Sequence, residues 1–356
     1  MLPGGRSVTI PTIQVLRAAA ALAVFGAHLM LELEKWSGVA VPHQTVIGGA
    51  GVDLFFVISG FIMVHVSGDL FGRVGAGAQF MARRLIRIVP LYWLLCAPLA
   101  LHAVVRYSDL TSADLSAGLI AASFAFIPWP RPTGELEPLL RPGWTLNYEM
   151  FFYVLFALSL AFRPRRAVMA TSAALIACVA AAPLLDPRSP YWPDSIVLEF
   201  IFGMAIATAR REKITLSARA CLALIMAGVT GLAWSVIAGA EVPRVIWWGI
   251  PAALVVAGAT LHPFELRSPA WQVPILLGDA SYALYLIHPF MNVPRLIAQR
   301  LLGWTDGPWL WWPAGYALFL AALIVGAAIA THLVVEKPLL RVLRTRLIAP
   351  GRLAMG

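Results

Sequence analysis

Charged residues are scarce in this sequence. Asp, Glu, Lys and Arg make up 13% of the 356 residues, whereas a soluble domain usually carries about 25%. Hydrophobic residues make up 60%, and apolar stretches long enough to cross a hydrocarbon core of about 30 Å recur along the whole chain. This composition excludes a soluble β-protein and a nucleic-acid-binding protein. It predicts an all-α, polytopic membrane protein.

Cysteine is also scarce, and so are the signatures of several other classes of protein. The three cysteines, Cys96, Cys178 and Cys221, all lie in apolar stretches. Their odd number and spacing argue against a disulfide framework or a zinc site. The glycine-rich segment GRVGAGAQF lacks the Lys-Ser/Thr pair of a phosphate-binding loop. No internal repeat is visible, so the inverted repeat of many transporters is missing.

The apolar stretches and the basic residues together predict the topology. If the N-terminus is cytoplasmic and Leu115 to Ile127 is not a span, most of the 27 Lys and Arg residues fall on the cytoplasmic side. The net charge of +9 then reflects topology and contact with anionic lipid. We expect ten transmembrane helices with both termini cytoplasmic, over residues 14–33, 47–66, 87–106, 146–162, 168–185, 195–209, 219–238, 245–261, 274–292 and 312–335.

The chain is therefore expected to be a single transmembrane domain, residues 1–356, with two parts outside the spans. The first is an external segment at 107–145, in which Leu115 to Ile127 either lies on the membrane surface or re-enters the membrane. The second is a short basic cytoplasmic tail at 336–356.

Ionisable residues inside spans are costly and are functional candidates by default. Counting residues from the ends of the expected spans places five of them in one outer layer of the membrane. Each also has a structural interpretation: either histidine can be a hydrogen-bonded structural residue, and Asp53 can cap a helix or pair with a neighbour. For Glu199 we favour a structural role. The five residues are His28, Asp53, Glu149, Glu199 and His288.

Arginines form a second, inner layer. Arg84 and Arg87 are three residues apart and so face the same way on a helix; Arg83 precedes them. Arg17 lies eleven residues before His28, which places both on one helix stripe about 16 Å apart. Convergent guanidinium groups suit the phosphates of a nucleotide-bearing ligand. The alternative is that these arginines only anchor helix ends at the cytoplasmic interface.

Six motifs occur in order along the chain, and together they carry a resemblance to a known family. They are Arg17 and His28 with ten residues between them, GVDLFFVISGF from Gly51, RLIR from Arg84, WTLNYEMFFY from Trp144, LGDASYALYLIH ending at His288, and VEKPL from Val335. The chain resembles the acyltransferase-three family of membrane proteins, which O-acylate envelope and exported glycans. Within this family, the sequences of the motifs are most similar to those of exopolysaccharide (succinoglycan-type) acetyltransferases.

The resemblance implies an O-acyltransferase of the bacterial cytoplasmic (inner) membrane. Its donor would be an acyl-CoA, usually acetyl-CoA, as a co-substrate with no tightly bound cofactor. Its acceptor would be a polysaccharide or lipid-linked glycan, and the polysaccharide export machinery is a further expected partner. A non-catalytic or transporter component of an export system is the alternative, and binding of acyl-CoA would distinguish the two.

The two layers of polar residues suggest how such an enzyme works. Arg17, Arg84 and Arg87, with help from Arg83, would hold the nucleotide end of the donor. His28 would take the proton of the attacking hydroxyl. Asp53, or with slightly less preference Glu149, would hold its other ring nitrogen, and His288 would orient substrate or stabilise the oxyanion. A covalent acyl-histidine intermediate stays open, and Trp129 and Trp144 either stack on sugar rings or anchor the membrane interface.

Overall fold

The computed structural model describes residues 10–38, 44–106, 116–131, 134–185, 194–238, 243–304 and 307–347, and within these ranges the chain is helical and contains no strand. Among the described residues, five helices are long and apolar enough to cross a membrane: Pro11–Ser37, Gly48–Val66, Ala76–Val105, Pro164–Ala182 and Pro313–Leu347. The all-α membrane architecture expected from composition is thus confirmed. The total of ten spans and the cytoplasmic position of both termini stay predictions.

The helices vary widely in length. The longer ones are α1 (Pro11–Ser37), α2 (Gln44–Val66), α3 (Ala76–Arg106), α5 (Trp144–Ser159), α6 (Pro164–Leu185), α7 (Glu199–Arg211), α8 (Ala218–Ala238), α9 (Ile250–Thr260), α14 (Pro313–Thr331) and α15 (Lys337–Leu347). The shorter ones are α4 (Ala117–Ala125), α10 (Gln272–Asp279), α11 (Ser281–Ile287), α12 (Val293–Leu302) and α13 (Pro308–Trp311). Two π-helical turns, η3 (Val245–Gly249) and η6 (His332–Glu336), lead into α9 and α15.

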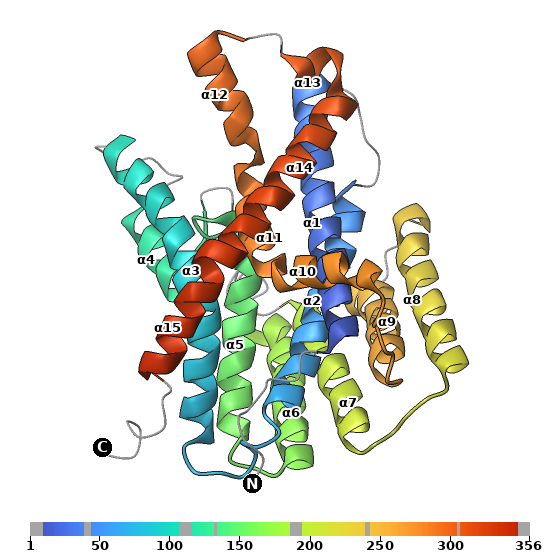
Figure 1. Ribbon diagram of the computed structural model, residues 1–356. Helices are drawn as coiled ribbons and strands as arrows, with labels where there is room; N and C mark the ends of the chain where they lie inside the picture. Colours follow the sequence, from blue (N-terminus) through green and yellow to red (C-terminus); the bar gives the residue numbers. More distant parts are fainter. Residues whose placement is uncertain are drawn as a thin grey trace.

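Small residues hold α1, α2 and α7 together at the centre of the fold (Figure 1). A Cβ atom on Gly51 would lie 2.7 Å from the carbonyl oxygen of Ala20 in α1. On the other side of α2, a Cβ on Gly60 would lie 2.1 Å from the carbonyl oxygen of Phe200 in α7. Close helix packing through small residues is typical of membrane proteins, where dispersion rather than the hydrophobic effect joins helices. The helices are therefore set backbone against backbone at these points.

The expectation of one continuous span at 274–292 is wrong. The segment is divided into α10, α11 and the 3-10 turn η5 (His288–Asn292), and α10 lies across α1 rather than along it in Figure 1. A Cβ on Gly278 would lie 2.0 Å from the carbonyl oxygen of Gln14, so α10 is pressed against the backbone of α1. Pro289, which has no N–H to donate, ends the α-helix after Ile287. The break turns His288 into the protein interior.

The last long helix extends beyond its expected end. α14, η6 and α15 follow one another without a gap to Leu347, so residues 336–347 are helical and Glu336 is buried. In Figure 1, the first residues of α1 and the last of α15 both point toward the lower side of the view. That both termini are cytoplasmic stays a prediction.

The segment expected outside the membrane, 107–145, contains the short helix α4 and the turn η1 (Arg141–Gly143), while residues 107–115 and 132–133 lie outside the described ranges. The nine residues of α4 are about 14 Å long, too short to cross a bilayer. The indole nitrogen of Trp93 in α3 donates a hydrogen bond to the carbonyl oxygen of Phe124, 2.9 Å away. Leu115 to Ile127 is therefore not a full span, as expected.

Candidate active site

The structure brings together two of the predicted site residues, His28 and His288. Their ring centroids are 4.8 Å apart, and the two rings are tilted by 55°. His28 comes from the middle of α1, and His288 from the turn that follows α11. His288 is 1% exposed, and its ring lies near the carbonyl oxygens of Leu284 and Tyr285 without a well-aligned hydrogen bond to either. We call these residues the histidine pair.

A backbone carbonyl fixes the tautomer of His28. The Nδ1 atom lies 2.8 Å from the carbonyl oxygen of Val24, one turn earlier in α1. A carbonyl oxygen can only accept, so Nδ1 carries a proton, and Nε2 is the nitrogen that lacks one whenever the ring is neutral. His28 is also exposed at the surface of the described structure. Its Nε2 lone pair is thus available to accept a proton from a bound hydroxyl group.

Asp53 does not contact His28, contrary to expectation. Both of its carboxylate oxygens accept hydrogen bonds from Arg244, at 3.0 and 2.7 Å. The Arg244 guanidinium lies over the ring of Trp248, 4.7 Å from its centroid. Glu199 is completely buried within electrostatic reach of both residues. Asp53, Glu199 and Arg244 form an acidic cluster, in which two buried carboxylates share one arginine.

Glu149, the other carboxylate considered for His28, also lies elsewhere. Its Oε1 atom accepts a hydrogen bond of 2.9 Å from the Ser59 hydroxyl of α2. Its charged neighbours are Arg84 and Arg17. The hydrogen bond expected between His28 and a carboxylate is therefore replaced by the bond to Val24, and Glu149 belongs with the arginines.

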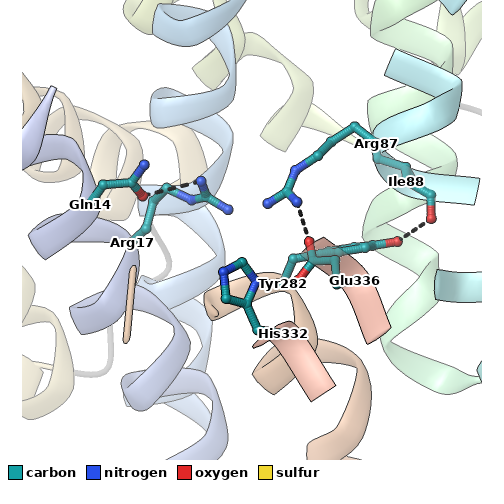
Figure 2. Close-up of polar contacts among 7 residues, drawn as sticks. All are labelled: Gln14, Arg17, Arg87, Ile88, Tyr282, His332 and Glu336. Carbon is teal, nitrogen blue, oxygen red and sulfur yellow. Dashed lines mark hydrogen bonds and ion pairs between the residues drawn. The ribbon is translucent and has the colours of Figure 1, made fainter. Parts of the chain in front are cut away.

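The arginines of the predicted inner layer do converge. Figure 2 shows the guanidinium groups of Arg17 and Arg87 facing each other from opposite sides. Arg17 donates a hydrogen bond of 3.3 Å from Nη1 to Oε1 of Gln14, which lies one turn earlier in α1. Arg87 forms an ion pair with Glu336. Arg84 lies within electrostatic reach of Arg87 and Glu149, and its buried Nε has no partner. We call Arg17, Arg84, Arg87, Glu149 and Glu336 the arginine cluster.

Arg83 is half-buried on α3, and the structure describes no ion pair or hydrogen bond between its side chain and this cluster.

The two tryptophans predicted for acceptor binding lie in different surroundings. Trp129 is 39% exposed, and its indole packs against Gly118 of α4, in the space that a side chain at that position would fill. Trp144 begins α5 and meets the ring of Tyr148 edge-on at 5.9 Å.

The single outer layer of five ionisable groups is not observed; it divides into three places at different depths. α1 and α2 are antiparallel, with Gly48 against Ala27 and Gly51 against Ala23 and Val24. Continuing this register puts Asp53 about 9 Å, and Ser59 about 18 Å, further along α1 from His28. The histidine pair, the acidic cluster and the arginine cluster therefore follow one another along α1. Glu149, bonded to Ser59, lies level with Arg17.

Sequence reasoning missed several polar partners. Arg244 is a basic residue on the predicted external side, against the positive-inside trend, and that exception was its only signal. His332 lies one turn before Glu336, on a helix that is otherwise apolar. Glu336 stands in the VEKPL motif but was assigned to a tail. Arg244 and Glu336 bond to residues in distant elements, Asp53 of α2 and Arg87 of α3, which the sequence does not specify. His332 bonds to Glu336 within the same π-helical turn.

Comparisons with known proteins identify the family of the chain. Residues 10–331 match a family model described as an acyltransferase domain. The chain is 34% identical over 315 residues to the exopolysaccharide production protein ExoZ of Rhizobium meliloti, covering 87% of this chain and 95% of that protein. It is 27% identical over 385 residues to the acyltransferase MdmB of Streptomyces mycarofaciens, covering 96% and 94%. No solved structure matches significantly. The chain therefore belongs to the acyltransferase-three family and is an acyltransferase.

Proposed function

We propose that this membrane enzyme transfers an acyl group, in the first instance acetyl, from acyl-CoA to a hydroxyl of an exported or lipid-linked polysaccharide. We place the enzyme, as part of this proposal, in the bacterial cytoplasmic membrane as a multi-pass protein. The observation that supports it best is the arrangement along α1: an exposed imidazole, bonded through Nδ1 to the Val24 carbonyl, lies about 16 Å from a cluster of arginines. An extended donor with an anionic end and a distant thioester fits this arrangement.

The arginine cluster would bind the donor's phosphates. Its three guanidinium groups carry three positive charges, and Glu149 and Glu336 supply two negative charges. One positive charge is thus left over, and Arg17 and Arg87 face each other. Two like charges in a poorly solvated place repel each other until an anion binds between them. Phosphate groups are suitable ligands because arginine presents a fork of N–H donors.

The histidine pair would carry the chemistry. Nε2 of His28 takes the proton of the acceptor hydroxyl as its oxygen bonds to the thioester carbon. The tetrahedral intermediate then breaks its carbon–sulfur bond, and the leaving thiolate takes the proton back from the imidazolium. The products are the O-acyl ester and free thiol. His288, which is buried beside His28, would donate a hydrogen bond to the developing oxyanion or orient the hydroxyl.

Asp53 and Glu149 would assist from a distance. In this proposal Asp53 orders Arg244, and Glu149 balances the charge of Arg17 and Arg84. Trp129, which is partly exposed, is the better placed of the two tryptophans to meet an acceptor sugar. The similarity to an exopolysaccharide production protein favours a polysaccharide acceptor. A polysaccharide export complex would be the natural partner of such an enzyme.

The test is transfer of a labelled acetyl group from acetyl-CoA to polysaccharide in membranes, comparing wild type with His28→Asn. The asparagine amide can still donate to the Val24 carbonyl but has no basic nitrogen. We expect a loss of about 10²- to 10⁴-fold in kcat, the usual contribution of a general base. A rate within threefold of wild type would refute the role of His28. Ping-pong kinetics would instead favour a covalent acyl-histidine intermediate.

A further inference from the structure

Glu336 is a buried carboxylate with both oxygens engaged. One oxygen pairs with the Arg87 guanidinium of α3, and the other lies 2.7 Å from Nδ1 of His332. The side chain of Glu336 is 1% exposed, whereas that of Arg87 is 22% exposed. Two partners on opposite oxygens prevent the carboxylate from rotating. The position of the arginine is therefore determined by a group that is itself fixed.

An aromatic ring restrains Arg87 from another direction. Its guanidinium carbon lies 5.7 Å from the ring centroid of Tyr282, within the usual range of a cation–π contact. The Tyr282 hydroxyl in turn donates to the carbonyl oxygen of Ile88, the residue next to Arg87, at 2.7 Å. Figure 2 shows this ring below the guanidinium, with Glu336 beside it. Contacts from η6 and α11 thus hold one side chain of α3.

Glu336 uses only part of the hydrogen-bonding capacity of Arg87. Guanidinium has five N–H donors, and the ion pair involves Nη1. In Figure 2 the other terminal nitrogen points toward the side on which Arg17 lies. A flexible arginine would have to lose rotamer freedom when a ligand binds, and that entropy cost weakens binding. An arginine already held in place avoids this cost.

We propose that Glu336, held by His332, is a positioning residue that orders Arg87 so that its free N–H groups and those of Arg17 receive the phosphates of the donor. This inference rests on the proposed function, because it assumes that the arginine cluster binds a phosphorylated donor. His332 and Glu336 both lie beyond the residues matched by the family model, 10–331. They also occupy a π-helical turn, a feature frequent at functional sites.

A purely structural role is the alternative. In that case the ion pair only fastens α3 to the C-terminal helix, and its loss lowers stability without regard to which donor is used. The two roles differ in one measurable respect. A positioning role affects donors that carry phosphates and spares donors that do not.

The experiment compares KM for acetyl-CoA with KM for a phosphate-free donor, acetyl-pantetheine thioester, in wild type and Glu336→Gln. Glutamine keeps the shape of the side chain but removes its charge. We expect KM for acetyl-CoA to rise about 10-fold, the scale of one charge-assisted hydrogen bond, with kcat within about threefold. KM for the phosphate-free donor should stay within twofold. Glu336→Asp, which keeps the charge, should recover part of the acetyl-CoA effect.

Glu212→Gln is the matched control, because it breaks an exposed ion pair with Arg165 at the end of α7 by the same chemical change. It should leave both KM values unchanged. If Glu336→Gln fails to fold, His332→Phe, which removes the donor to Glu336, should show the same selective rise at a smaller scale. Equal effects on both donors, or no effect on either, would overturn the proposal. If wild type itself does not distinguish the two donors, the assignment of the arginines to phosphate binding fails instead.

Discussion

Replacing Arg244 by methionine should destabilise the protein more than replacing Asp53 by asparagine, although the two residues form one ion pair. Arg244→Met leaves Asp53 and Glu199, both fully buried, without a cation. Asp53→Asn leaves Arg244, which is 27% exposed, with Glu199 and solvent as remaining partners. It also removes the repulsion between the two carboxylates. The loss of stability should therefore be asymmetric.

The magnitudes follow from what each variant leaves buried. Removing one partner of a buried ion pair usually costs about 3–5 kcal/mol, because the remaining charge is not compensated. We expect Arg244→Met to reach that range. Asp53→Asn should cost about 1–2 kcal/mol, since a hydrogen bond to Arg244 can be kept and Glu199 stays nearby. Adding Glu199→Gln to Arg244→Met should recover about 1 kcal/mol or more.

Unfolding by SDS in mixed micelles measures these differences as changes in the free energy of unfolding. Each variant should be compared with wild type and with Glu212→Gln, which alters an exposed ion pair and should change stability by less than about 1 kcal/mol. Equal losses for Arg244→Met and Asp53→Asn, or no recovery on adding Glu199→Gln, would refute the view that two carboxylates share one arginine.

Two further predictions concern packing and the histidine pair. Gly60→Ala should lower the free energy of unfolding by about 1–3 kcal/mol, because its Cβ would lie 2.1 Å from the Phe200 carbonyl oxygen. Gly326→Ala, whose Cβ would have nothing within 4 Å, should be neutral or stabilising by up to about 1 kcal/mol. Unfolding in SDS measures both, and equal stability of the two variants would contradict the packing. His288→Gln should stay within about 1 kcal/mol of wild type in unfolding, since neither ring nitrogen makes a well-aligned hydrogen bond, but it should slow acetyl transfer about 10-fold or more. Unchanged transfer would exclude His288 from the chemistry.

Sequence patterns predicted the elements of this fold better than their depths. The apolar lengths correctly predicted α1, α2, α3, α6 and α14 as long membrane helices. The spacing of Arg17 and His28 held because both residues lie on one uninterrupted helix. The break between α10 and α11 escaped prediction, since it depends on Gly278 meeting the backbone of α1. No local pattern around Gly278 specifies that contact.

The candidate site was predicted as a set of residues but not as an arrangement. Counting from span ends assumed helices of equal depth, and this assumption put Glu149 beside His28. The real depth of Glu149 is set by its bond to Ser59, and the depth of Ser59 is set by the glycine contacts between α1 and α2. Likewise, the partner of Arg87 is 249 residues away. Such pairings depend on tertiary packing, which periodicity and composition do not contain.

Binding of acetyl-CoA to the purified protein tests most directly the proposal that donor binding and chemistry take place at different ends of α1. Titrations should compare wild type, His28→Asn and the double variant Arg84→Gln/Arg87→Gln in detergent. We predict that His28→Asn binds acetyl-CoA within about threefold of wild type but does not transfer the acetyl group, and that the arginine variant binds at least about 10-fold more weakly. Wild-type affinity in a folded arginine variant, or loss of binding in His28→Asn, would contradict the account.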